Sequence, residues 1–109
     1  QEQKILERVG LRENEAKALA AVLTALRLQY NNQALTVAPS TRTGVQVALA
    51  LLGKKPDGTN GQPRVTWSAA LTLYVTGALP DDQANAARLA ATGALASHKI
   101  ANPDECVPQ

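Results

Sequence analysis

Residues 66–77 read TWSAALTLYVTG and directly follow Arg64 and Val65. Apolar or small side chains occupy the odd positions of this stretch, and hydroxyl-bearing or small side chains occupy the even positions. An alternation of period two over about a dozen residues is typical of a β-strand with two different faces. The stretch therefore predicts a long strand over 64–76, with one apolar face and one uncharged face rich in hydroxyl groups.

The preceding segment favours the same secondary structure. Residues 45–51 place Val45, Val47, Leu49 and Leu51 on one face, and residues 34–38 predict a shorter strand that ends at Pro39. Residues 53–63 contain three glycines and two prolines, which is typical of a loop. Two long strands joined by this loop predict an antiparallel hairpin.

Two other segments have helical spacing. Residues 14–29 repeat leucine and valine at steps of three and four, with Asn14 as the expected N-cap. Residues 81–97 follow Pro80 and begin with two aspartates, which suits a helix start. The helix should bury a stripe formed by Ala84, Ala87, Ala91 and Leu95, with Leu89 as a further candidate.

These elements predict an α+β fold in which an antiparallel β-sheet carries the C-terminal helix on one face. We expect a single domain over 1–109. It comprises an N-terminal segment that is helix or hairpin (1–33), antiparallel strands (34–77), a C-terminal helix (80–100) and a tail (101–109).

The composition bears on how the core is built. The chain has 109 residues, 45% of them hydrophobic, with 20 alanines and no Phe or Met. Because alanine buries little area, a single copy should have a thin core, and we expect dimerisation to complete it. The net charge of +2 is too small to indicate nucleic acid by itself. No run of 18 apolar residues is present, so we expect no membrane association.

Residues that carry catalytic chemistry are sparse. His98 is the one histidine and lies near a predicted helix end, and the segment GKKPDG lacks the spacing of a phosphate-binding loop. Cys106 is the one cysteine, so it forms no internal disulfide, and no cysteine–histidine cluster suits a metal. We therefore predict a protein that is not an enzyme and has neither cofactor nor metal.

Two longer segments carry a resemblance to a known family. LTVAPSTRTGVQVALAL at 35–51 and VTWSAALTLYVTGALPDDQANAARLAATGALAS at 65–97, with the loop between them, resemble the coat proteins of single-stranded RNA bacteriophages of the levivirus type. The resemblance covers about residues 35–100. It implies a homodimer with one continuous sheet, a partner's helix over the outer face, and an icosahedral shell that packages single-stranded RNA. It also implies synthesis in the cytoplasm of a bacterial host and a final location in the virion.

The resemblance also implies roles for particular residues. The inner, polar sheet face would bind RNA, and the loop before the last strand would lie between subunits. The expected RNA-binding residues are Thr36, Arg42, Gln46, Arg64, Thr66, Ser68, Thr72 and Tyr74, and those of the inter-subunit loop are Lys54, Lys55, Asp57 and Asn60. The same polar face could instead simply meet water, as in many antiparallel sheets.

The sequence departs from the family in two places. The family begins with a β-hairpin, whereas residues 14–29 have helical spacing. The family also has basic and aromatic residues on its inner strands where this chain has Gln46 and Ala70, which weakens the case for recognition of a specific RNA hairpin.

Two other classes of protein remain open. A winged-helix DNA-binding regulator would use 14–29 as its first helix, 40–55 as the recognition helix and 54–67 as the wing. That alternative requires residues 45–51 to be helical. A non-enzymatic oligomeric adaptor that binds no nucleic acid is the third class, and the low net charge is compatible with it.

Overall fold

The stretch predicted to be the longest strand folds as a helix. A computed structural model describes residues 2–55, 57–100 and 102–105, and in it helix α4 spans Trp67–Tyr74, followed by a 3-10 turn, η1, at Thr76–Ala78. The hydroxyl of Thr66 caps α4 by accepting a hydrogen bond from the Ala69 amide at 3.1 Å. Trp67, Ala70 and Leu71 are buried at helical spacing, whereas Leu73, expected beside Leu71, is 65% exposed.

The second predicted strand is also helical. Helix α3 spans Thr41–Leu51 and begins at Ser40, whose hydroxyl accepts a hydrogen bond from the Thr43 amide at 3.2 Å. The residues buried along α3 recur at steps of three and four, namely Gly44, Val47, Ala48 and Leu51. The alternation of valine and leucine matches the period of a strand, but it does not indicate which residues are buried. This is the helical conformation that the winged-helix alternative requires.

The predicted α+β fold is wrong, because the described residues form no sheet. Five α-helices account for the fold, and with η1 they make 65% of the described residues helical. The remaining helices are α1 (Glu2–Val9), α2 (Glu13–Asn31) and α5 (Asp81–Ser97). The strand predicted at 34–38 is an irregular connection, and the sole β-type pairing within the described chain is an isolated bridge between Lys54 and Asn60.

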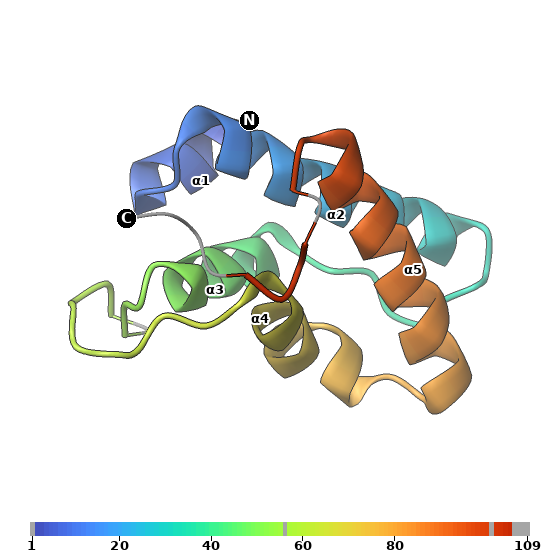
Figure 1. Cartoon of the computed structure of the whole chain (residues 1–109). Helices are drawn as coiled ribbons and strands as arrows, with labels where there is room; N and C mark the ends of the chain where they lie inside the picture. Colours follow the sequence, from blue (N-terminus) through green and yellow to red (C-terminus); the bar gives the residue numbers. More distant parts are fainter. Residues whose placement is uncertain (1, 56, 101, 106–109) are drawn as a thin grey trace.

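The helices predicted over 14–29 and 81–97 are present as α2 and α5, and they pack against each other along the molecule (Figure 1). Their directions are opposite, because the Asn14 amide group donates to the His98 carbonyl at 3.0 Å while Gln29 donates to Ala86 at the other end at 3.2 Å. The α2 helix begins after Arg12, whose backbone amide donates to the Glu15 carboxylate, so the expected cap at Asn14 is wrong.

Helices α1 and α3 lie side by side and run in the same direction. At their N-terminal ends the Thr41 hydroxyl donates to the Glu2 carboxylate at 3.0 Å. At their C-terminal ends the Lys54 ammonium donates to the Val9 carbonyl at 3.1 Å. The loop that follows α3 is thereby held against the end of α1, on the left of Figure 1.

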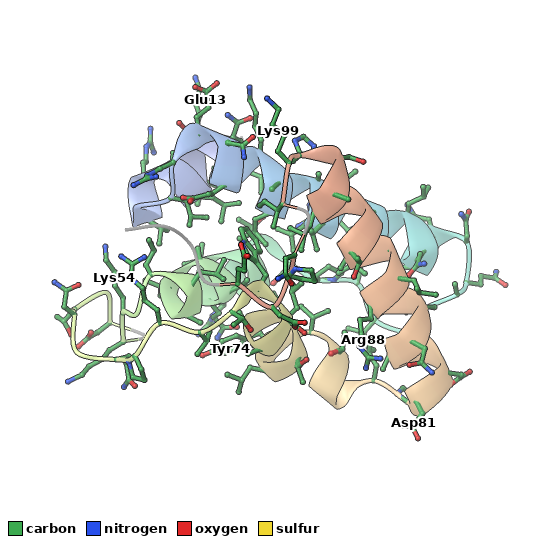
Figure 2. All side chains as sticks on the ribbon, viewed as in Figure 1. Glu13, Lys54, Tyr74, Asp81, Arg88 and Lys99 are labelled. Atoms are coloured by element: carbon green, nitrogen blue, oxygen red, sulfur yellow. The ribbon has the colours of Figure 1, made fainter. Side chains whose placement is uncertain are left out.

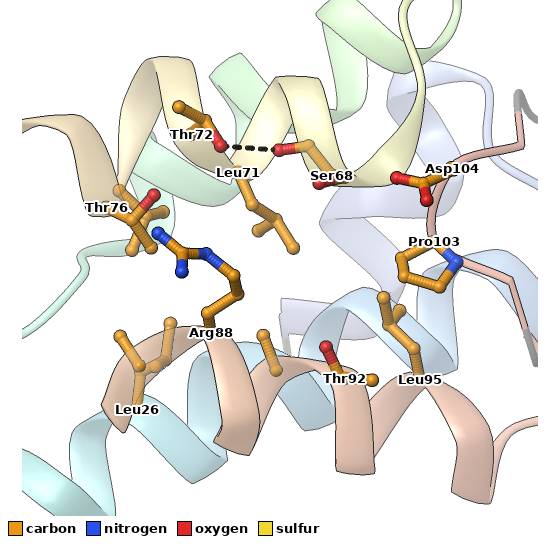
Figure 3. A pocket seen from close by; sticks show the side chains of 13 residues that line it. Leu26, Ser68, Leu71, Thr72, Thr76, Arg88, Thr92, Leu95, Pro103 and Asp104 are labelled. Carbon is orange, nitrogen blue, oxygen red and sulfur yellow. Dashed lines mark hydrogen bonds between the residues drawn. The ribbon is translucent and has the colours of Figure 1, made fainter. Parts of the chain in front are cut away.

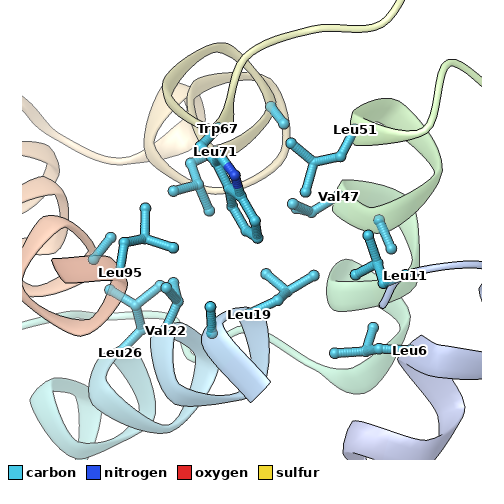
Figure 4. Packing of buried hydrophobic residues seen from close by; sticks show 14 of the residues in the cluster. Leu6, Leu11, Leu19, Val22, Leu26, Val47, Leu51, Trp67, Leu71 and Leu95 are labelled. Carbon is cyan, nitrogen blue, oxygen red and sulfur yellow. The ribbon is translucent and has the colours of Figure 1, made fainter. Parts of the chain in front are cut away.

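One chain encloses its own core. Side chains from all five helices meet in one cluster, with Trp67 between α3 and α5 (Figure 4). Eight large aliphatic side chains are fully buried within the single chain, with no second subunit to cover them: Leu6, Leu19, Val22, Leu23, Leu26, Val47, Leu51 and Leu95. The expectation that dimerisation completes the core is therefore wrong. The α5 stripe of Ala84, Ala87, Ala91 and Leu95 is buried as predicted, but it packs within its own chain, and Leu89 is 76% exposed.

The division of the chain into segments needs one revision. Residues 34–77, predicted as strands, comprise a connection, α3, a loop, α4 and most of η1. Among the described helices none combines the length and hydropathy needed to cross a bilayer. Cys106 lies outside the described residues.

Candidate nucleic-acid interface

The expected RNA-binding residues do not share one surface. Arg42 and Gln46 are exposed one turn apart on α3, and Arg64 lies in the loop after it. Thr36 bonds Gln83 of α5 through both its amide and its hydroxyl, at 3.0 Å each. Because the sheet is absent, the predicted inner face does not exist as a structural unit.

The remaining members of that set belong to α4 and its ends. Thr66 caps the helix, and the Thr72 hydroxyl donates to the Ser68 carbonyl one turn earlier at 2.8 Å. Ser68 and Thr72 line a cavity between α4 and α5. Tyr74 lies elsewhere, beside a smaller apolar hollow formed with Leu35 and Leu79. Of the hydroxyl-bearing residues that alternate in the sequence, Thr66 thus caps α4, and Ser68 and Thr72 form part of the cavity wall.

The residues expected in an inter-subunit loop form an ordered turn. Lys54 and Asn60 pair as a β-bridge, and the Lys55 amide donates to the Thr59 carbonyl at 2.7 Å. The Thr59 hydroxyl and amide both donate to the Asp57 carboxylate, which lowers the pKa of that carboxyl. Asp57 therefore stays charged and is the single acidic group of this turn.

The turn gathers positive charge beside the end of α1. We call Arg8, Arg12, Lys54, Lys55 and Arg64 the basic end. The bond from the Lys54 ammonium to the Val9 carbonyl holds the loop next to the C-terminal end of α1. In the sequence, Arg8 directly precedes Val9, and Arg12 follows it by three residues. The loop lies at the left of the molecule, where Figure 2 labels Lys54, while Asp81 lies at the lower right.

The charge of the chain is unevenly divided between these regions. Residues 2–12 and 40–66 contain seven basic and three acidic residues, whereas residues 67–105 contain two basic and four acidic ones. The small net charge therefore conceals one positive and one negative region. A surface of this kind attracts a polyanion to its positive side and orients it there.

The members of the basic end differ in how they are held. Lys54 is half-buried, and its ammonium is fixed by its bond to the Val9 carbonyl of α1. Arg8 and Lys55 are exposed, and no ion pair joins either of them to another described residue. These two side chains can contact phosphate without first breaking a salt bridge.

Helix α1 contributes to the basic end, although no site residue was predicted in it. Residues 1–11 mix polar and apolar side chains, but Lys4 and Arg8 are four apart and therefore lie on one face of a helix. That spacing was the available signal. The contact between α1 and the loop, made by Lys54 and the Val9 carbonyl, is a tertiary feature that local sequence does not report.

Metal binding finds no support among the described residues. No group of three or more histidine, cysteine or carboxylate side chains is placed to hold a metal there. His98 caps the end of α5, and its carbonyl accepts the bond from Asn14. Comparison of the chain with protein-family models, with curated proteins and with solved structures finds no match.

Proposed function

We propose that this protein binds nucleic acid through the phosphate backbone, using the basic end as its contact surface. The observation that carries the proposal is the bond from Lys54 to Val9, which brings cationic residues from α1, the α1–α2 turn and the loop to one place. Lysine and arginine side chains supply most of the free energy of non-specific binding, since they displace counterions from the phosphates.

Duplex DNA is the ligand we propose to test first. Helix α3 presents Arg42 and Gln46 on its exposed side, and such side chains read base edges when a helix lies in the major groove. The loop of the basic end follows α3 directly, as the wing would in the winged-helix alternative. However, nine residues connect α2 to α3, which is longer than the turn of about three or four residues in a helix-turn-helix. We therefore propose DNA binding without that motif.

A matched pair of variants tests the surface. Arg8→Gln with Lys55→Gln removes two charges from the basic end without removing any side-chain bond found among the described residues. Lys17→Gln with Lys99→Gln removes two charges outside the basic end, at the cost of one exposed pair between Lys17 and Glu13. Figure 2 labels Glu13 and Lys99 at the upper side of the molecule. Both variants carry the same net charge.

The measurement is fluorescence anisotropy with a labelled duplex of about 20 base pairs at about 100 mM salt. We expect the Arg8/Lys55 variant to bind roughly tenfold more weakly than the wild type, because each lost phosphate contact costs several-fold at this salt. The Lys17/Lys99 variant should bind nearly as the wild type does. Equal weakening in both variants, or no binding by the wild type, would contradict the proposal. A single-stranded RNA of equal length tells whether RNA is preferred.

Assembly into an RNA-containing shell, the function implied by the coat-protein resemblance, stays a prediction. The described residues offer no sheet to form its inner face. Electron microscopy of the purified protein, with the absorbance ratio at 260 and 280 nm, tests it directly.

A further inference from the structure

A cavity lies between α4, α5 and residues 103–104, away from the basic end (Figure 3). Its volume is about 220 Å³. Its floor is apolar, and two of the α5 residues there are alanines, which leave the space open. The floor residues are Leu26, Leu71, Ala87, Ala91 and Leu95. An apolar cavity of about 150 Å³ holds benzene, so this one has room for a single ring or a short branched chain.

Two hydrogen-bond donors face one end of the cavity. Thr76 is only 6% exposed, and its hydroxyl has no hydrogen-bond partner among the described residues. Arg88 donates through Nη1 to Asn85 at 2.9 Å and forms no ion pair within the described part of the chain. Figure 3 shows the Arg88 guanidinium and the Thr76 side chain pointing toward one another across the space between α5 and η1.

The opposite end of the cavity carries the other charge. Asp104 lines it beside Pro103, and Figure 3 shows Asp104 well separated from Arg88. The cavity thus has a positive end and a negative end, and its wall also includes the hydroxyl-bearing residues Ser68, Thr72 and Thr92. A ligand with one anionic group is oriented by this arrangement, and a second anionic group near Asp104 is repelled.

We propose that this cavity binds a small monocarboxylic acid with a compact apolar body. The carboxylate pairs with the guanidinium of Arg88, a geometry that accepts two parallel hydrogen bonds, and takes a third from the Thr76 hydroxyl. The apolar body lies on the alanine and leucine floor. The guanidinium of Arg88 supports this assignment, because it forms no ion pair among the described residues and can take a carboxylate without first breaking one.

The first experiment compares three probes by amide chemical-shift titration of the wild-type protein. Benzoate has both the charge and the ring, benzamide has the ring without the charge, and acetate has the charge without the ring. We expect benzoate to shift amides of α4, η1 and α5 and to bind roughly tenfold or more tightly than either of the others. No shift with benzoate up to about 10 mM, or equal affinity for benzoate and benzamide, overturns the proposal.

Two variants separate the charge from the cavity. Arg88→Gln, at an exposed position, should reduce the affinity for benzoate to that for benzamide and leave benzamide binding unchanged. Ala91→Leu fills the floor and should abolish binding of both, provided that circular dichroism shows the helices intact. The control is Lys99→Gln, which removes a charge outside the cavity. An Arg88→Gln variant that binds benzoate as tightly as the wild type overturns the assignment.

Discussion

Arg27 holds three segments of the chain together through one guanidinium. Its two terminal nitrogens donate to the two carboxylate oxygens of Glu2, at 2.8 and 2.6 Å, and its Nε donates to the Pro39 carbonyl at 2.9 Å. Thr41 completes the cluster by donating to Glu2. The bond from Arg27 is the main reason that the pKa of Glu2 lies below its ordinary value of 4.5. This cluster fixes the N-terminal ends of α1 and α3 against α2.

Replacing Glu2 should therefore lower stability in a pH-dependent way. At pH 7 we expect Glu2→Gln to lower the free energy of unfolding by about 1–2 kcal/mol, since the bonds to Arg27 and Thr41 lose their charged partner. A lowered pKa in the folded state means that the contribution is complete above pH 4.5 and is lost as the pH falls through the folded value. Urea unfolding across pH should show the difference from wild type shrinking below pH 4.5.

Glu13→Gln is the matched control for this prediction. Glu13 pairs with Lys17 on the surface of α2, and its side chain is 69% exposed. Such a pair contributes roughly 0.5 kcal/mol or less. A Glu2→Gln difference that stays constant from neutral to acid pH would show that the ion pair is not its source.

Gly53 fixes the turn that leads from α3 into the basic end. Its φ is +70°, and an added Cβ would lie 2.7 Å from the Gln62 carbonyl oxygen. Gly58 also has a positive φ, of +90°, but nothing lies within 4 Å of an added Cβ there. We expect Gly53→Ala to lower the free energy of unfolding by about 1–2 kcal/mol more than Gly58→Ala, measured by urea unfolding. Equal losses would mean that the close approach to Gln62 is relieved without cost.

Single residues were predicted with uneven success. The burial of the α5 alanines could be predicted from their spacing, because residues at steps of three and four lie on the same face of a helix. The partners of Arg27 and the position of Arg88 could not be read, since each depends on segments that are distant in sequence. The free hydroxyl of Thr76 depends equally on the packing of η1 against α5.

At the scale of elements, the N-cap of α3 is a point where one side chain decides a helix boundary. We expect Ser40→Ala to cost about 1 kcal/mol, because the Thr43 amide loses its acceptor. Ser40→Asp keeps an acceptor and should remain within about 0.5 kcal/mol of the wild type. The check is thermal unfolding followed by circular dichroism at 222 nm. If the two variants were equally destabilised, the capping bond would not be what matters at this position.

The two misread elements, α3 and α4, share one cause. In each, apolar residues are so frequent that patterns of period two and period 3.6 both find matches. Valine at 45 and 47 favours a strand, whereas the alanines, the leucines and the caps Ser40 and Thr66 favour a helix. The cap residues were the better signal, because a serine or threonine before an apolar run marks a helix start.

At the scale of the whole molecule, the buried leucines indicate that one chain folds alone. We expect a melting temperature that does not change over a hundredfold range of protein concentration, because the core leucines are buried within one chain and need no second subunit to cover them. A melting temperature that rises with concentration would show that folding requires association. Homodimerisation of the folded chain stays a separate prediction, which sedimentation velocity tests.

We propose that the charge asymmetry of the whole molecule directs it onto nucleic acid through the basic end. The most direct measurement is the dependence of the dissociation constant for duplex DNA on salt, from about 50 to 200 mM. Three to five neutralised phosphates give a slope of the logarithm of the association constant against the logarithm of the salt concentration of about −3 to −4.5, and the Arg8/Lys55 variant should be shallower by nearly 2. The Lys17/Lys99 variant should keep the wild-type slope. A flat dependence, or one slope shared by all three proteins, would contradict the account.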